Sequence, residues 1–364
     1  MYFCRPVAGK FDQYLIDALV ACLTNMIKDT DNLKNNDPID VVICWVDGDD
    51  PRHQQKMAPF LKNINRSSIP GAHPTRFASV NEIRYCVLSV LTFAPFVRNI
   101  YIVTDEQDPG VHDEVKKYFP EKAHSVKIVD HTEIFRGYEK YLPTFSSRAI
   151  ESMIWRIEGL SDSFIYLNDD NFLIRETQKE DFFVNNRPVL RGNWCYDQYL
   201  RLSWKKLQTG IQKYLLGNKN FQARSSFHLV QWKSAHYLGM KWRYFYMDHT
   251  PHPLKRKSAE DFFLNNRIML ETNLEHRFKN HRQLNLISLL YHCELLQSNT
   301  HILKPALAYL QPYKRSEKYL ERKISFCEQN NDIKFLCIQS MEMCNKDQQK
   351  KVFDWLDHLL GLKS

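Results

Sequence analysis

Short apolar runs alternate with amphipathic helical patterns along the first half of the chain. Runs rich in branched apolar residues predict four buried strands, at residues 39–46, 99–103, 125–129 and 164–168. Between them, apolar residues spaced three and four positions apart predict helices at 81–93, 111–118 and 146–158. This alternation is typical of an α/β protein with a mainly parallel sheet and flanking helices. The chain after residue 258 has mostly helical patterns, so we expect a helical C-terminal part.

The same patterns divide the chain into segments. Apolar spacing predicts an amphipathic helix at 11–28, and the polar run after it predicts a linker. We therefore expect four parts, namely an N-terminal helix and linker over 1–36, an α/β part over 37–190, a basic aromatic helical segment over 191–258, and a helical part over 259–364 that completes the same domain.

Acidic residues directly follow four of the predicted strands. They are Asp47, Asp105, Asp130 and the adjacent pair Asp169 and Asp170. Burying an isolated charge costs on the order of several kcal/mol, so the pair cannot lie inside a strand and belongs at its carboxyl end. Ligands bind at that edge of open α/β sheets, and adjacent carboxylates there can hold a divalent cation on a diphosphate. A solvated turn is the alternative interpretation, because Asn-Asp-Asp-Asn is also turn chemistry.

The composition excludes several classes of protein. It is 43% hydrophobic and 25% charged, which is typical of a globular chain. No run approaches the roughly 18 apolar residues of a transmembrane helix, and the N-terminus lacks the apolar core of a signal peptide. Nine cysteines without any Cys-x-x-Cys spacing favour reduced thiols over a disulfide framework or a zinc site. We therefore expect a cytoplasmic protein.

The net charge of +8 is concentrated in one segment. Residues 191–258 contain thirteen Lys or Arg but only two Asp, together with several Trp and Tyr. A basic aromatic surface suits a polyanion, a sugar polymer or a membrane headgroup. A solvated amphipathic helical face is an equally good interpretation.

Several separated segments carry a longer signature. The first is Ile39 to Pro51, the second begins at Arg76 and continues to Asn168-Asp169-Asp170, and the third is His249-Thr250-Pro251-His252. The second includes Asn81-Glu82-Ile83-Arg84-Tyr85, Ile102-Val103-Thr104-Asp105 and Arg156-Ile157-Glu158-Gly159-Leu160. Together these segments resemble the conserved blocks of the Stealth family of sugar-phosphate transferases, which includes bacterial capsule polymerases and the eukaryotic lysosomal N-acetylglucosamine-1-phosphotransferase.

The C-terminal side departs from the pattern of that family. An Arg follows its His-x-Pro-His element, and the position here aligns with Lys279, flanked by Arg277 and Arg282. Lysine neutralises a phosphate but lacks the bidentate fork of a guanidinium. The family's fourth block usually contains Cys-Ile-Asn-Asp, whereas this chain has Cys337-Ile338-Gln339-Ser340. The carboxylate expected there is therefore missing.

The resemblance implies a hexose-1-phosphate transferase. It would move a sugar-1-phosphate, expected to be an N-acetylhexosamine-1-phosphate, from a UDP-sugar to a hydroxyl of a capsular polysaccharide or oligosaccharide, releasing UMP and forming a phosphodiester. Such phosphoryl transfer needs cations on the diphosphate and a base for the acceptor hydroxyl. Two alternatives stay open, namely a conventional metal-dependent glycosyltransferase that releases UDP and a non-catalytic polyanion-binding module.

The resemblance also implies a fold and a set of partners. The fold would be Rossmann-like or GT-A-like, with residues 37–190 binding the nucleotide sugar. Besides the UDP-sugar donor and the capsular acceptor, we expect peripheral association with the inner membrane face or with the capsule export machinery. No nucleic acid partner is expected.

Carried over position by position, the resemblance assigns catalysis to Glu151, Asp170 and His252. Asp169 and Asp170 would hold the divalent cation, Mg²⁺ or Mn²⁺. The expected substrate-binding residues are Asp40, Trp45, Asp47, Gly48, Arg76, Glu82, Arg84, Asp105, Asn168, Arg277, Lys279 and Arg282. From the residues alone, Glu151 is more typical of a solvated helix position and His252 of a loop histidine. An ion-pair network is the favoured role for Arg84, and a phosphate contact for Arg76.

Overall fold

The computed structural model describes residues 37–61, 72, 77–215, 217, 226–280, 282–313 and 315–362. The predicted N-terminal helix and linker over 1–36, and Arg76, lie outside the described residues.

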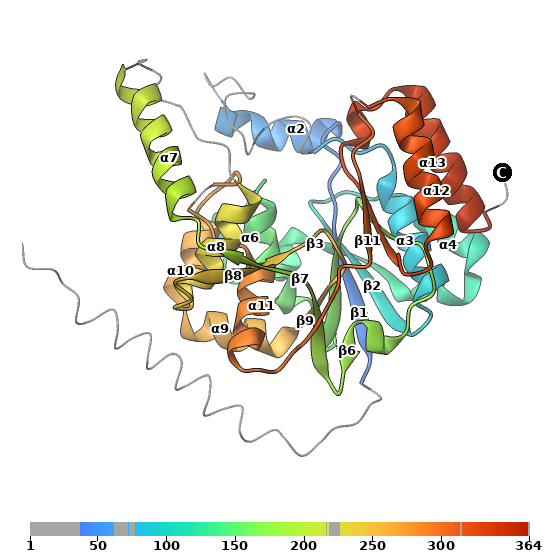
Figure 1. Ribbon diagram of the computed structural model, residues 1–364, viewed down its shortest axis with the longest axis horizontal. Helices are drawn as coiled ribbons and strands as arrows, with labels where there is room; N and C mark the ends of the chain where they lie inside the picture. Colours follow the sequence, from blue (N-terminus) through green and yellow to red (C-terminus); the bar gives the residue numbers. More distant parts are fainter. Residues whose placement is uncertain are drawn as a thin grey trace, which may run out of the picture.

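A five-stranded sheet forms the centre of the molecule (Figure 1). Its strand order is β3–β2–β1–β4–β9. The bounds are β1 (Ile39–Cys44), β2 (Val97–Thr104), β3 (Val126–Asp130), β4 (Ser163–Asn168) and β9 (His252–Lys255). The first four strands are parallel, whereas β9 runs antiparallel to β4. The predicted strands and the mainly parallel α/β sheet are thus confirmed.

Both faces of this sheet are covered, as is usual for parallel strands. One face, with Ile39, Val41 and Ile43 of β1, shares an apolar cluster with helices that lie on one side of the sheet in Figure 1. They are α3 (Glu82–Phe93), α4 (His112–Tyr118), α12 (Glu317–Gln329) and α13 (Lys346–Leu359). The other face, with Val42 and Tyr166, shares a second cluster with α5 (His131–Ile134), α6 (Ser147–Glu151), α9 (Arg256–Asn265), α10 (Arg267–Leu274) and α11 (Leu286–Leu296).

Smaller strand groups extend the core. Strand β7 (Arg187–Tyr196) pairs with β6 (Phe183–Val184), β8 (Arg243–Met247) and β10 (His301–Leu303). A three-stranded sheet joins β11 (Leu307–Leu310), β12 (Phe335–Ile338) and β5 (Asn171–Leu173). The C-terminal part therefore contains three short strands besides its helices. The pairing of β5 with β12 places Cys337 opposite Asn171. Since Asn171 directly follows Asp170, this pairing brings β12 close to Asp170.

Two helical predictions differ from the structure. Segment 191–258 contains α7 (Tyr199–Gly210) and α8 (Phe227–Tyr237), but also most of β7 and all of β8 and β9. The helix predicted at 146–158 is α6, which stops at Glu151, followed by a 3-10 turn at Ile154–Arg156. The carbonyl of Ser152 accepts a hydrogen bond from the Trp155 indole at 3.0 Å, which takes up an acceptor that a longer helix would use. Glu151 therefore stands at the end of a helix and not in its middle.

Within the part of the chain that the structure describes, no helix combines the length and the apolar content needed to cross a membrane.

Candidate functional site

Asp169 and Asp170 lie in the turn between β4 and β5, at the carboxyl end of the central strand β4. Both are half-buried. Burial raises the pKa of both carboxyls, and for Asp169 the adjacent Asp170 raises it further. The pKa of Asp170 reaches about 7, through burial and then through the charge of Glu82. Two adjacent carboxyls with raised pKa values favour a cation or a proton beside them.

Glu82 brings a third carboxylate to this edge from the start of α3. It is buried, and it accepts a hydrogen bond from the backbone N–H of Val80 at 2.7 Å. Burial raises the pKa of Glu82, and its charge in turn raises the pKa of both aspartates. Carboxylate oxygens are the ligands that Mg²⁺ and Mn²⁺ prefer, so the donor chemistry fits such an ion. Among the described residues, however, no group of three His, Cys, Asp or Glu is arranged to enclose a metal.

On the opposite face of β4, Glu151 forms the centre of a buried polar cluster. Its Oε1 accepts hydrogen bonds from the Ser147 hydroxyl at 3.0 Å and the Tyr166 hydroxyl at 3.4 Å, and its Oε2 accepts one from the Asn285 amide at 3.4 Å. Burial raises the pKa of Glu151, while the charges of Lys279 and Arg148 oppose the rise. A carboxyl with a raised pKa is suited to proton transfer near neutral pH.

Tyr166 connects this cluster to the turn that contains Asp169 and Asp170, which we call the acidic turn. Its hydroxyl lies 3.4 Å from Glu151 Oε1 and 3.1 Å from Asn168 Oδ1. Tyr166 and Asn168 are two residues apart on β4, so they share one face of the strand. The prediction of site residues missed Tyr166. The sequence signal for it was its position two residues before Asn168 on the same strand, which places both side chains on one face.

Among Arg277, Lys279 and Arg282, Lys279 is the residue whose charge acts on the carboxylates of the site. Its charge lowers the pKa of both Glu151 and Asp170, so it is within electrostatic reach of both sides of the site. Arg277 instead donates hydrogen bonds to the backbone carbonyls of Tyr141 and Pro143. Arg282 is exposed. The electrostatic effect on Glu151 and Asp170 thus comes from Lys279, the residue aligned with the family's arginine, while Arg277 is occupied by backbone carbonyls.

His252 lies on β9 directly opposite Tyr166 of β4. Its ring is buried, and Nδ1 lies 3.0 Å from the Tyr291 hydroxyl. Burial, and then the neighbouring His249, lower the pKa of His252 to about 3. His252 is therefore neutral at physiological pH. A pKa this low makes it a weak base, so its ring is suited to a hydrogen bond and not to binding phosphate as a cation. His249 itself is near Lys279, whose charge adds to burial in lowering its pKa.

The loop after β1 lies beside the loop after β2. The backbone N–H of Asp47 donates to Gln107 Oε1 at 3.0 Å, and the Trp45 indole donates to the Ser79 hydroxyl at 3.4 Å. Gly48 donates its N–H to the carbonyl of Phe77 at 2.6 Å, and a Cβ on Gly48 would lie only 2.3 Å from the Phe77 Cβ. Close backbone approach therefore explains this glycine.

Asp105 belongs to the same edge, at the end of β2. Its Oδ1 accepts a hydrogen bond from Lys56 Nζ at 2.9 Å, and its Oδ2 lies 3.6 Å from His53 Nδ1. Burial opposes ionisation, but the contacts with His53 and Lys56 prevail and hold the pKa of Asp105 at about 2. Asp105 is therefore a fixed negative charge. It differs in this from Asp169 and Asp170, whose pKa values are raised.

Two predicted substrate-binding residues have charged partners within the fold. Asp40 sits near the amino end of β1, fully buried, where it accepts two hydrogen bonds from Arg98 and others from the backbone of Asn99 and Ser161. Its oxygens are used by the fold, at the end of the strand away from the acidic turn. Arg84 forms the ion pairs favoured for it, with Glu114 at 3.2 Å and Asp357 at 3.4 Å.

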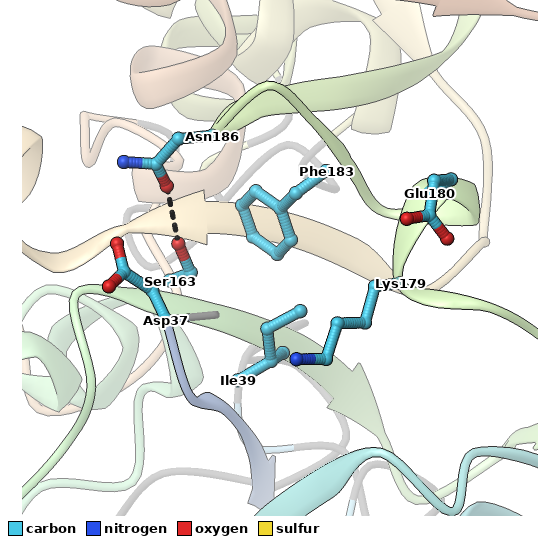
Figure 2. Close-up of a pocket in the computed structure, with 7 residues that line it drawn as sticks. All are labelled: Asp37, Ile39, Ser163, Lys179, Glu180, Phe183 and Asn186. Atoms are coloured by element: carbon cyan, nitrogen blue, oxygen red, sulfur yellow. Dashed lines mark hydrogen bonds between the residues drawn. The ribbon is translucent and has the colours of Figure 1, made fainter. Parts of the chain in front are cut away.

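A pocket at the amino ends of β1 and β4 is a separate feature. Figure 2 shows its lining, with the Ser163 hydroxyl donating to Asn186 at 3.1 Å and Lys179 extending toward Ile39. Asn185 and Asn186 form the turn between β6 and β7 above it. Since the acidic turn is at the carboxyl end of β4, this pocket does not belong to the candidate site.

The raised pKa of Asp170 predicts a pH dependence of stability. The unfolded pKa is near 3.8 and the folded pKa about 7, so this stability is fully present below about pH 4 and is lost as the pH rises from there through 7. Asp170→Asn carries no charge at any pH. We expect it to raise the free energy of unfolding by about 1–3 kcal/mol at pH 8, with a gain that shrinks as the pH falls toward 4.

Thermal unfolding at several pH values measures this effect. The matched control is Asp354→Asn, which removes an exposed carboxylate that pairs with Lys350. It should shift Tm little. A Tm gain for Asp170→Asn that is the same at pH 5 and pH 8, or no gain at all, would contradict the assigned environment of Asp170.

Known proteins share these conserved segments. Models of the Stealth family match residues 37–64 (Stealth protein CR1, conserved region 1) and 76–189 (Stealth protein CR2, conserved region 2). A capsular polysaccharide phosphotransferase of Neisseria meningitidis serogroup B is 39% identical over 171 residues, which are 46% of this chain and 43% of that protein. The capsular polysaccharide phosphotransferase cps1A of Actinobacillus pleuropneumoniae is 41% identical over 149 residues, 41% of this chain and 39% of its own. The chain thus spans less than half the length of these relatives.

Among solved structures, the galactosyltransferase LgtC in complex with donor and acceptor sugar analogs is similar at 11% identity with a TM-score of 0.41. The match covers 88% of this chain and 95% of that one.

Proposed function

Because this chain belongs to the Stealth family, we propose that it is a sugar-phosphate transferase. It moves a hexose-1-phosphate, in our proposal N-acetylhexosamine-1-phosphate, from a UDP-sugar to a hydroxyl of a capsular polysaccharide or oligosaccharide. The β-phosphorus forms a bond to the acceptor oxygen and breaks its bond to the oxygen shared with the α-phosphate, so UMP leaves and a phosphodiester remains. The observation that supports this best is the acidic turn at the end of β4, within electrostatic reach of Lys279 and beside Glu151.

The negative charge of the diphosphate must be offset, and two features of the chain suit that task. Asp169 and Asp170 would hold Mg²⁺ or Mn²⁺, and the nearby negative charge of Glu82 would favour the cation. A bound cation supplies positive charge at the diphosphate. Lys279, whose charge acts on Asp170, would add a second positive charge. Its ammonium acts as a point charge, without the fork of the arginine that relatives carry.

Proton transfer from the acceptor hydroxyl is assigned to the buried side of the site. Glu151 is our proposed base, because burial raises its pKa and three hydrogen-bond donors hold its carboxyl in place. His252 is neutral and buried opposite Tyr166, and its low pKa makes it a weak base, so it is proposed to orient the acceptor hydroxyl through a hydrogen bond. Asp170, Glu151 and His252 are thus our proposed catalytic residues.

The loops at the carboxyl edge are proposed to bind the donor. Trp45, Asp47 and Gly48 follow β1 and Asp105 follows β2, so they share an edge with Asn168. Arg76 keeps its proposed phosphate contact from the family resemblance alone.

Identification of the released nucleotide tests this function. The full chain is incubated with UDP-N-acetylhexosamines and a capsule oligosaccharide primer, and the nucleotides are separated by chromatography. We expect UMP in amounts equal to the product, no turnover with EDTA, and recovery with added Mg²⁺ or Mn²⁺. Release of UDP would establish a conventional glycosyltransferase instead, and primer binding without any donor turnover would establish a polyanion-binding module.

A further inference from the structure

Helix α7 projects away from the body of the molecule, at the upper left of Figure 1. It spans Tyr199–Gly210 and continues into a π-helical turn at Ile211–Leu215. None of the residues of α7 is fully buried. The helix therefore lacks the fully buried apolar face of an ordinary surface helix.

Large apolar side chains form a stripe along the outer side of this helix. The members of the outer stripe are Leu200, Trp204, Leu207, Ile211 and Tyr214, spaced alternately four and three residues apart. All are exposed, with Leu200 and Tyr214 at 88% and Trp204 at 68%. The spacing places them on one face of the helix.

The opposite side of α7 faces the protein. Its partly covered residues are Leu202, Lys205, Thr209, Gly210 and Gln212, and Leu202 packs against the small core of α8 and β8. This arrangement reverses the usual one, since polar residues face the body and the apolar stripe faces solvent.

Positive charge accompanies the outer stripe. From Tyr199 to Gly210 the sequence contains Arg201, Lys205 and Lys206 and no acidic residue. The body beneath is also basic, because Arg148, Lys206, Lys205 and Arg282 add to burial in lowering the pKa of Lys233 to about 8. At the base of the helix, Tyr196 and Trp242 are 86% and 80% exposed.

We propose that α7 is an amphipathic anchor that lies in the surface of an anionic lipid bilayer, with the outer stripe among the acyl chains and the basic residues at the headgroups. Such helices combine an apolar face with flanking Lys and Arg, and Trp and Tyr favour the interface. A second copy of the chain is the weaker occupant, because two such surfaces would bring like charges together. The run Lys255 to Lys257 is a poorer lipid site, since Lys255 pairs with Asp162 and Arg256 with Glu260.

Vesicle sedimentation of the full chain tests the proposal. Wild-type protein should pellet with phosphatidylcholine vesicles that contain about one third phosphatidylglycerol, and pelleting should weaken in high salt. The triple variant Leu200→Ser, Trp204→Ser and Leu207→Ser should bind at least about tenfold more weakly. Arg201→Glu with Lys206→Glu should lose binding to the anionic vesicles.

A matched control removes apolar residues that are equally exposed elsewhere. Leu264 and Ile268 are 68% and 84% exposed near the junction of α9 and α10, so Leu264→Ser with Ile268→Ser should bind vesicles like the wild type. Unchanged circular dichroism and Tm show that the triple variant is folded. The proposal is overturned if wild-type protein stays in the supernatant, if the triple variant pellets normally, or if light scattering shows a dimer that only the triple variant dissociates.

Discussion

Replacing Asp170 by Asn is expected to lower kcat for sugar-phosphate transfer by at least about 10³-fold. The substitution keeps the size of the side chain but removes a carboxylate from the acidic turn at the end of β4. The cation that Asp169 and Asp170 together can hold would then bind weakly or not at all, and the negative charge of the donor diphosphate would no longer be offset. Initial rates of UMP release with saturating UDP-sugar measure the loss.

Stability separates this effect from simple unfolding. Asp170→Asn removes a carboxyl whose pKa is raised to about 7, so the variant should be more stable than the wild type above neutral pH while it is inactive. Asp354→Asn, the exposed control, should keep both activity and Tm. Near-normal turnover by Asp170→Asn would exclude this residue from catalysis.

Removing Arg98 should destabilise the protein by about 3–5 kcal/mol, because it leaves the buried Asp40 carboxylate without its charged partner. The guanidinium donates to Asp40 at 2.9 and 2.6 Å, and Asp40 has no exposed surface. Chemical denaturation of Arg98→Ala measures the loss as a lower midpoint at an unchanged slope.

Arg267→Ala provides the control for this substitution. Arg267 is exposed and pairs with Glu271 one helical turn away, so its loss should cost at most about 0.5 kcal/mol. If Arg98→Ala instead keeps wild-type stability but raises KM for the UDP-sugar, Asp40 would contact the donor after all, as the family resemblance first suggested.

The central sheet and its acidic edge could be predicted from the sequence because each follows from local pattern. Apolar runs bounded by Asp mark both a strand and the point where it ends, as at Asp105 and at Asp169. Once the strands are parallel, their carboxyl ends meet at one edge, so residues far apart in sequence converge without further information.

Local pattern fails where distant contacts decide. Residues Glu180 to Arg187 and Glu260 to Arg267 are nearly identical, yet the first forms a turn and the β6–β7 hairpin while the second continues helix α9 into α10. Pro188 follows the first copy and disfavours helical backbone before it, and Asn185 and Asn186 adopt positive φ in the hairpin turn. Ile268 follows the second copy and imposes no such restriction.

Several members of the candidate site were beyond prediction for the same reason. Asn285 reaches Glu151 across 134 residues of sequence, and β12 joins β5 from the far end of the chain. Asp40 shows the opposite case, in which a residue was assigned to the site although its partners lie within the fold. From the sequence alone, an aspartate that binds a ligand cannot be told from one that binds an internal arginine. Only the tertiary structure shows that Arg98 takes its oxygens.

The nature of the bond in the product tests the central claim most directly. Phosphorus NMR of the acceptor, after incubation of the full chain with a UDP-N-acetylhexosamine, should show a new phosphodiester resonance together with free UMP. Asp170→Asn should give neither signal. A product without phosphorus, formed with release of UDP, would show that the acidic turn serves glycosyl transfer and would contradict sugar-phosphate transfer.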